Sequence, residues 1–584
     1  MISFVYFAWQ ALHVIVPSLC SRSSFTLHVS PPPQNGQLKT VDTFGFAFLG
    51  GALAFFRLPI ALRALLRAAR AERAQPLRAA RRLRLRRASS ATEAISRSPT
   101  PPTAPPRGTS VATMRLSDVA KARRPALLRS LAPLLQEEGM LWLAGGLPSP
   151  LAFPIEQVHL TLKHGVQVDI TEPATIAKSQ QYMLDSGGWG YAPLLEWLRA
   201  HVAEQHRPQY DEWGVLVSAG NADAMQRVWE TLLNPGDTLL IEELSFAFSI
   251  SALRPWTHAR GLHVECVPLT PRGIDGDALD ALLSDWEAKR PGARFPRVLF
   301  LVPQGQNPSG ADLEEPELRH IYDVCRRHDV SIVEDDPCAA RNSARNSARN
   351  SARNFLTPTT THLSRYRYLH FGDATAPPSK AAPPPGLRGL RRSFLSVDTD
   401  GRVIRMDSFS KWIAPGLRMG FISGPKPILT KLAQGAPPGM NVAAFMQVLL
   451  HSMLSAWGGA GLERHLGELQ LAYRHRCAVA LAAMDEHLTG VAEWRAPQTG
   501  MFVWVRLPVV SSLALMDELK RAKVAVVPGA FFASDPEGSK SPFVRLSFAY
   551  ATDDDIKEGI LRLGALLRAG TPAESSAWNL WGLL

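Results

Sequence analysis

The stretch SFSKWIAPGLRMG, residues 408–420, places an amine between groups that can bind a phosphate. The amine of Lys411 can form a Schiff base with an aldehyde when its surroundings keep it partly unprotonated. Ser408 and Ser410 precede this lysine and Arg418 follows it, and hydroxyls and a planar guanidinium are suitable donors to a phosphate dianion. A lysine among serines is by itself most often a solvated surface residue. The spacing of Ser408, Ser410 and Arg418 around Lys411 favours a binding site instead.

Apolar segments rich in β-branched residues alternate with helical segments before this stretch. The strand-like segments are Val215–Ser218, Thr238–Glu242, Val298–Val302 and Ser331–Glu334, and the helical ones include Ala222–Leu233 and Glu315–His328. This alternation predicts an α/β fold in which a mainly parallel sheet lies between helices.

Three polar motifs lie where these strands are expected to end. VSAGNADA (217–224) leads from a strand into a helix whose first N–H groups can hold a phosphate. QNPSG (306–310) and VEDDP (333–337) follow later strands, and loops after parallel strands line the ligand crevice of an α/β sheet. Each motif read alone is also compatible with a structural turn or a solvated loop.

In the content and order of these motifs, the chain resembles the fold-type-I pyridoxal-phosphate (PLP) aminotransferases. The branch it looks most like is that of the aromatic-amino-acid and kynurenine/α-aminoadipate aminotransferases, and the resemblance runs from about Leu116 to Leu567. It implies a large domain with a mainly parallel sheet and a smaller α+β domain. It also implies that Lys411 both anchors the cofactor and shuttles the proton of transamination.

The resemblance assigns the other cofactor contacts residue by residue. Asp335 would bind the pyridine nitrogen, where a carboxylate keeps the ring protonated and makes it a better electron sink. Asn307 would donate to the phenolic oxygen of the cofactor, and Phe246 would stack on its ring. The phosphate would be held by Asn221, Ala222, Ser408, Ser410 and Arg418.

The resemblance also implies a substrate site and a partner subunit. Arg545 would hold the α-carboxylate of the substrate as a bidentate pair. Tyr182 would reach the phosphate of the neighbouring subunit, which implies a homodimer with composite active sites. The remaining substrate contacts would come from Gly146, Asn307, Arg129 and Phe502, and no metal is expected.

Residues 338–365 depart from the family pattern. Where the family continues with a tyrosine whose hydroxyl binds the cofactor, this chain has Cys338, followed by a repeat of Ser-Ala-Arg-Asn. Removing 338–365 places Tyr366 directly after Pro337 and restores the pattern. The segment is therefore expected to be a disordered insertion. Either Tyr366 takes the catalytic tyrosine position or Cys338 does, and in the second case the activity would fall.

Charge and cysteine content exclude several other classes of protein. Residues 1–113 hold fifteen Lys and Arg against three acids, which accounts for the whole net charge of +12. The rest of the chain is balanced, so no basic groove for nucleic acid is indicated. The five cysteines show no C-x-x-C spacing, so neither a disulfide framework nor a zinc site is predicted. Reduced cysteines suit the cytoplasm.

The expected organisation has four parts. Residues 1–113 form a basic, partly apolar extension, expected to be disordered and without a firm membrane segment. This extension is either an upstream sequence that is not part of the enzyme or, given its Arg-rich composition, a mitochondrial targeting segment. The N-terminal arm and part of the small domain (114–175), the large PLP-binding domain (176–440) and the C-terminal small domain (441–584) follow.

The predicted reaction is transamination between an L-amino acid and a 2-oxo acid such as 2-oxoglutarate. The resemblance implies an amino donor of the aromatic, kynurenine or 2-aminoadipate type. Two alternatives use the same fold, a PLP-dependent β-lyase or decarboxylase, and a PLP-binding protein impaired by the insertion. A PLP-dependent transcription regulator is less favoured, because residues 1–113 show no helix-turn-helix pattern.

Overall fold

The computed structural model describes most of the chain between residues 114 and 570. The predictions for 1–113, Arg129, Cys338 and Tyr366 lie outside the described residues. Within 114–570, the residues not described are 126, 128–130, 132–133, 135–136, 142, 144–145, 184–185, 337–368, 370, 372–373, 376–392, 436–441 and 537–538.

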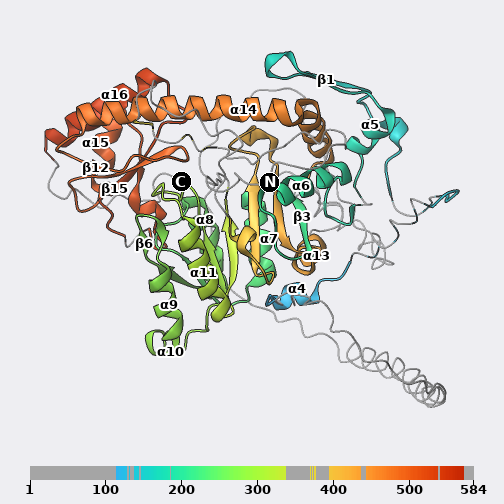
Figure 1. Ribbon diagram of the computed structural model, residues 1–584, viewed down its shortest axis with the longest axis horizontal. Coiled ribbons are helices and arrows are strands. Elements are labelled where there is room, and N and C mark those ends of the chain that lie inside the picture. Colours follow the sequence, from blue (N-terminus) through green and yellow to red (C-terminus); the bar gives the residue numbers. More distant parts are fainter. Residues whose placement is uncertain are drawn as a thin grey trace, which may run out of the picture. The chain divides into compact units, whose positions relative to one another are not determined.

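A seven-stranded sheet forms the centre of the described chain (Figure 1). The strand order is β3 (Trp213–Ser218), β11 (Gly420–Pro425), β10 (Val403–Ser408), β9 (Ser331–Asp335), β8 (Val298–Leu301), β4 (Thr238–Glu242), β5 (His263–Val267). Neighbouring strands from β10 to β5 are parallel, and β11 runs antiparallel to both β10 and β3. The predicted mainly parallel sheet is confirmed, with one reversed strand.

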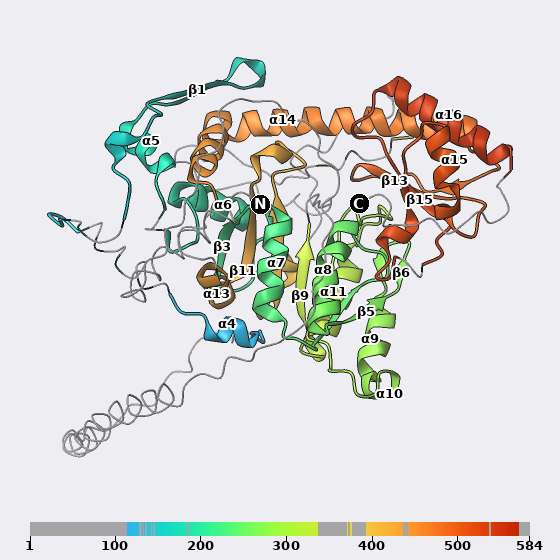
Figure 2. The ribbon, with the colours of Figure 1, turned by 180° about the vertical axis from the view of Figure 1, so that it is seen from behind.

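Both faces of this sheet are covered by helices, which Figures 1 and 2 show from opposite sides. Alternate strand residues point to opposite faces. Leu240, Leu299 and Ile332 belong to the apolar core that includes α6 and α11, whereas Leu239 and Phe300 belong to the core that includes α7, α8 and α13. This double burial explains why the strands read as continuous apolar runs. The helices are α6 (Ala192–Gln205), α7 (Asn221–Leu232), α8 (Ala247–Arg260), α9 (Gly276–Ser284), α11 (Glu315–Arg327) and α13 (Lys426–Gly435).

The C-terminal part is a separate layer of helices on an antiparallel sheet. The sheet has the order β12 (Glu493–Trp494), β13 (Phe502–Arg506), β15 (Phe543–Ser547), β14 (Val527–Pro528). It packs with α15 (Met516–Arg521), α16 (Asp553–Arg568) and the end of α14 (Ala444–His487) in a third apolar core. The predicted smaller α+β domain is thereby confirmed.

Helix α14 joins the two layers. It contacts α5 (Pro173–Gln180) and α6 toward one end and α16 toward the other, and it bends at Gly458, whose φ is +56°. No helix among the described residues is both long and apolar enough to cross a membrane. The short elements are α4 (Asp118–Ala122), β1 (Val158–Thr161), β2 (Gln167–Ile170), β6 (Leu269–Thr270), β7 (Gly273–Ile274), α10 (Trp286–Lys289) and α12 (Phe394–Val397).

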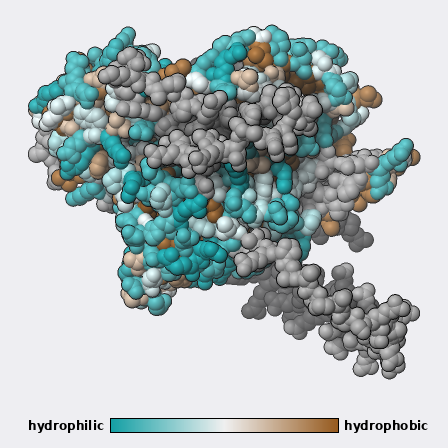
Figure 3. All heavy atoms as spheres, in the orientation of Figure 1, coloured by the Kyte–Doolittle hydropathy of each residue, from teal (hydrophilic) through white to brown (hydrophobic). Residues whose placement is uncertain are grey.

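The outward sides of the helices are polar. On the face shown in Figure 3, hydrophilic residues dominate and hydrophobic ones are scattered among them. Helix α11 illustrates the cause, because Leu318, Ile321 and Val324 are buried while Arg319 and Arg326 pair with acids at the surface. An amphipathic helix of this kind packs its apolar stripe on the sheet.

A buried ionic cluster holds the carboxyl ends of β9 and β10 together. Arg405 lies opposite Glu334 in the parallel register, and its Nη1 is 2.9 Å from Glu334 Oε1 and 3.0 Å from Asp336 Oδ2. Its Nη2 is 2.7 Å from Asp407 Oδ1. Burial raises the pKa of all three carboxyls, that of Asp336 to about 8. One guanidinium thus stabilises three carboxyl groups that water does not reach.

We predict that Arg405→Met lowers the free energy of unfolding by about 3–5 kcal/mol, because it leaves buried carboxyls without their cation. Urea unfolding measures this loss. Arg327→Met is the matched control, because Arg327 pairs with Asp280 at 2.8 Å but its side chain is 52% exposed. The control should lose less than about 1 kcal/mol. Equal losses in the two variants would contradict the role given to the cluster.

Candidate active site

The carboxyl ends of the parallel strands bring the predicted motifs to one edge of the sheet. Residues 219–221 follow β3, residues 302–310 follow β8, Asp335 ends β9, and the stretch 408–411 begins at the end of β10. This edge is where α/β sheets bind ligands. Motifs far apart in the sequence therefore meet because the strands that precede them are neighbours or near neighbours.

Asp335 is buried and faces α7. Its Oδ1 accepts a 2.6 Å hydrogen bond from Nδ2 of Asn221, the first residue of α7, and the same Nδ2 lies 3.2 Å from the carbonyl oxygen of Met406. Burial raises the pKa of Asp335 to about 6, although the Asn221 bond and the positive charge of Lys411 oppose that rise. A carboxylate in this position is ionised at neutral pH and is directed by Asn221.

The Lys411 turn is anchored by its neighbours while the lysine itself is exposed. Phe409 and Trp412 are buried, with ring centroids 4.8 Å apart, and Trp412 Nε1 donates to the Ser408 carbonyl oxygen at 2.8 Å. The Ser408 hydroxyl oxygen accepts from the Ser410 backbone N–H at 3.2 Å. These contacts fix the backbone on both sides of Lys411 and leave its amine free to face a ligand.

Two glycines allow this turn to approach the start of α7. Gly220 has a φ of +94°, and a Cβ added there would lie 3.0 Å from Arg418 Nη2. A Cβ on Gly420 would lie 2.7 Å from the Asp407 carbonyl oxygen and 2.9 Å from the Gly220 Cα. Arg418 Nη2 donates to the Ala219 carbonyl oxygen at 3.0 Å. The guanidinium and the first N–H groups of α7 therefore lie together.

Arg545 joins the C-terminal sheet to the loop that carries Asn307. Its Nη1 donates to Asn307 Oδ1 at 2.8 Å, and its guanidinium lies 3.8 Å from the centre of the Phe502 ring. Burial lowers the pKa of Arg545 to about 10, so it stays charged at neutral pH. No described carboxylate forms an ion pair with it, and its Nε is buried without a partner. A half-buried cation of this kind suits a carboxylate ligand.

Phe246, Ala222, Gly146 and Tyr182 form no hydrogen bond to Lys411, Asp335, Asn307 or Arg545 within the described part of the chain. Phe246 precedes α8, with its ring centroid 5.3 Å from that of Phe248. Ala222 is exposed in the first turn of α7, and Gly146 is exposed in its loop. Tyr182 is 54% exposed.

Sequence reasoning missed the buried polar groups beneath the site. Glu242 was expected only as the end of a strand and Gln306 only as part of the 306–310 motif, and Arg405 was not identified. All three are at most 1% exposed. The sequence does contain a signal for such groups: a charged or amide side chain that lies inside an apolar strand or directly after it. Such groups are rarely buried unless they are paired.

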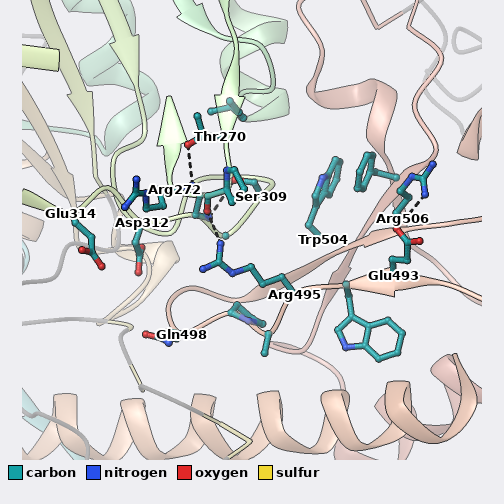
Figure 4. Close-up of a pocket in the computed structure, with 18 residues that line it drawn as sticks. Thr270, Arg272, Ser309, Asp312, Glu314, Glu493, Arg495, Gln498, Trp504 and Arg506 are labelled. Atoms are coloured by element: carbon teal, nitrogen blue, oxygen red, sulfur yellow. Dashed lines mark hydrogen bonds and ion pairs between the residues drawn. The ribbon is translucent and has the colours of Figure 1, made fainter. Parts of the chain in front are cut away.

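The cavity shown in Figure 4 is separate from the candidate active site. It has a volume of about 600 Å³ and lies between the loop after β8 and the strands β12 and β13, with Arg495 and Trp504 among its lining residues. It contains none of the residues predicted for cofactor or substrate. Its wall does include Asp312, which accepts from the Gly305 N–H at 2.6 Å and from the Thr499 hydroxyl at 3.1 Å.

Comparisons with known proteins point to one family of enzymes. The sequence pattern of the family described as aminotransferase class I and II matches residues 166–337 and 366–563, so 338–365, the segment set apart above, is not matched. The bovine mitochondrial kynurenine/alpha-aminoadipate aminotransferase is 30% identical over 78% of this chain and 98% of its own length. An aromatic amino acid aminotransferase of Schizosaccharomyces pombe is 27% identical over 78% and 97%.

Two solved structures similar to this chain are also aminotransferases. Aminotransferase Aro8 from Candida albicans superposes with a TM-score of 0.65 at 25% identity, covering 79% of this chain and 99% of its own. The aromatic aminotransferase Aro9 of the same organism superposes with a TM-score of 0.63 at 26% identity, over 78% and 97%. The expected fold, with a parallel-sheet domain and a smaller α+β domain, is confirmed.

We predict that Gly420→Ala destabilises the fold by about 1–3 kcal/mol, because the new methyl group would overlap backbone atoms of Asp407 and Gly220. Gly416→Ala is the matched control in the same stretch, since nothing lies within 4 Å of a Cβ at that position. Urea unfolding of the two variants gives the comparison. The packing argument fails if Gly420→Ala unfolds at the urea concentration of Gly416→Ala.

Proposed function

The chain belongs to the class I and II aminotransferase family, and we propose that it transfers an amino group from an aromatic, kynurenine or 2-aminoadipate type L-amino acid to a 2-oxo acid such as 2-oxoglutarate. The cofactor of the reaction is PLP. The arrangement that carries the proposal is the half-buried Arg545, hydrogen-bonded to Asn307 and without a carboxylate partner among the described residues.

The residues at the sheet edge fit this cofactor. Several buried polar atoms there have no partner within the described chain, and such atoms are costly unless a ligand completes them. They are Ser218 Oγ, Asn221 Oδ1, Ser245 Oγ and Arg545 Nε. When bound, PLP supplies an aldehyde for the amino group and a ring that stores the electron pair from the broken Cα–H bond.

The protein holds the two ends of the cofactor with opposite charges. The Asp335 carboxylate, directed by Asn221, keeps a proton on the pyridine nitrogen. The phosphate would be held by the N–H groups at the start of α7, including that of Ala222, by the Ser408 and Ser410 hydroxyls and by Arg418. Phe246 would stack against the ring.

Lys411 and Arg545 act on the substrate. Lys411 Nζ would be the base that removes the proton from the substrate Cα and the acid that later returns it. Arg545 binds the substrate carboxylate and so fixes the direction of the Cα–H bond, and Asn307 holds the guanidinium in place. Phe502 lies against that guanidinium and forms an apolar wall of the side-chain pocket.

The subunit contacts and the remaining substrate contacts complete the proposal. Tyr182, exposed in one chain, reaches the phosphate site of a second copy and makes the enzyme a homodimer. Gly146 and Arg129 contribute to the substrate pocket. The family match resumes at residue 366, which supports Tyr366 rather than Cys338 as the counterpart of the family's tyrosine. The compartment we propose is the cytoplasm, or the mitochondrion if the Arg-rich residues 1–113 belong to the protein.

The donor class rests on the named relatives. The bovine relative is named for kynurenine and α-aminoadipate, and the yeast relatives for aromatic amino acids. Phe502 beside Arg545 supports an apolar or aromatic side chain in the donor. A β-lyase or decarboxylase is not favoured, because the matched relatives are named aminotransferases.

We predict that the wild-type enzyme transaminates 2-oxoglutarate with phenylalanine, kynurenine or 2-aminoadipate, and that Lys411→Ala lowers the rate at least about 100-fold through loss of the general base. Borohydride reduction should attach the cofactor to the peptide containing Lys411. Lys557→Ala, a surface change on α16, is the control and should keep the wild-type rate. Attachment at another lysine would contradict the assignment.

We predict that Arg545→Lys raises the KM for the amino donor about 10- to 100-fold, because a lysine cannot form the planar bidentate pair. Steady-state kinetics with a saturating 2-oxo acid measures this change. Arg506→Lys on the neighbouring strand is the control, since Arg506 is exposed and pairs with Glu493. A KM for Arg545→Lys equal to that of the control would remove Arg545 from the substrate site.

A further inference from the structure

The turn that carries Asn307 is held by the side chain of Gln306. Gln306 Nε2 donates to the Leu244 carbonyl oxygen at 2.6 Å and lies 3.3 Å from Glu242 Oε2. Its Oε1 accepts from the Ser309 backbone N–H at 3.0 Å and from the Ser309 hydroxyl at 2.6 Å. One buried amide therefore connects the end of β4 to both sides of Asn307.

Glu242 is the most deeply buried residue in the hydrogen bonds that join β4 to the Asn307 turn. It is the last residue of β4 and is 0% exposed. Its Oε2 accepts from the Val302 backbone N–H at 3.0 Å as well as from Gln306. Both donors are neutral amides, and no described cation forms an ion pair with it. A buried carboxyl in such surroundings is more stable with its proton than without it.

A hydrogen-bonded chain thus runs from the sheet to the substrate arginine. Glu242 binds Gln306, Gln306 fixes the turn around Asn307, and Asn307 accepts from Arg545. The amide of Asn307 can face the cofactor and the arginine correctly only if this turn is held. Glu242 and Asp335, the two carboxyls at this edge, differ in pKa. Burial raises the pKa of Glu242 to about 8 and that of Asp335 only to about 6.

We propose that Glu242 is a positioning residue that acts in its uncharged form, through Gln306, to place Asn307 against the cofactor and Arg545. The inference rests on the proposed function. An uncharged Glu242 also leaves Asp335 as the ionised carboxyl at this edge, since a second negative charge nearby would make Asp335 harder to ionise.

The test compares purified holoenzyme variants at matched positions. Gln306→Leu removes the side-chain hydrogen bonds that join Glu242 and Leu244 to the Asn307 turn. Gln304→Leu is its control, because Gln304 is equally buried in the same loop and donates to the Leu313 carbonyl oxygen at 2.9 Å. Glu242→Leu removes the carboxyl, and Glu242→Gln keeps its shape and its acceptor oxygen without a charge.

The main readout is the pH titration of the visible absorption of the bound cofactor, which responds to hydrogen bonds made to its phenolic oxygen. Gln306→Leu and Glu242→Leu should shift the midpoint by about one pH unit and lower kcat/KM by about 100-fold. Gln304→Leu should keep the wild-type midpoint. Glu242→Gln should restore the midpoint that Glu242→Leu loses.

Stability gives a second readout with a defined sign. The pKa of Glu242 is raised from 4.5 to about 8 by folding, so unfolding releases its proton and stability falls as pH rises across that window. Asp335 is the charged group that faces Glu242. The melting temperature of Glu242→Gln should therefore exceed that of the wild type by a margin that grows from pH 5 to pH 8.

Three results would overturn the inference. The first is a Glu242→Gln variant with the absorption midpoint of Glu242→Leu, which would mean that the charge is required. The second is a Gln304→Leu variant that behaves like Gln306→Leu. The third is a wild-type enzyme with no visible absorption after incubation with PLP, and this result alone would also overturn the proposed function.

Discussion

The ionic cluster around Arg405 is the constraint on which the site depends. It fixes β9 against β10 at their carboxyl ends, because one buried guanidinium binds Glu334, Asp336 and Asp407. The alternation of side chains along β9 then turns Asp335 to the opposite face, where Asn221 meets it. The same end of β10 starts the turn that carries Lys411. A slip of one residue between these strands would move every one of these groups.

The substrate half of the site depends on a second, longer-range contact. Asn307 lies in the loop after β8 and Arg545 in strand β15 of the C-terminal sheet, 238 residues apart in the sequence, yet their side chains share a hydrogen bond. Asp312 adds a further contact between the same two parts of the chain, through Gly305 and Thr499. The Asn307 turn is therefore held from beneath by β4 and from outside by the C-terminal sheet, and the substrate arginine is directed by a residue of the cofactor half.

Much of the fold could be predicted from the sequence because its strands are buried on both faces. The segment 238–242 matches its strand, and 298–302 and 331–334 each differ by one residue at one end. Strand β10 was harder to predict, because Arg405 and Asp407 interrupt its apolar pattern. Arg405 has further partners, Glu334 and Asp336, at the end of β9. The roles of Glu242 and Gln306 were missed for the same reason. A buried polar residue is interpretable only when its partner is known, and the partners that link these residues to other elements are 60 to 71 residues away.

The central claim is that the chain performs transamination in two halves, and a single-turnover reaction tests it most directly. Holoenzyme is mixed with an amino donor in the absence of any 2-oxo acid acceptor, and the 2-oxo acid released is measured per chain. The account predicts a burst of about one equivalent that stops until 2-oxoglutarate is added. Continued product formation without an acceptor, as a β-lyase or decarboxylase would give, or no product at all, would contradict it.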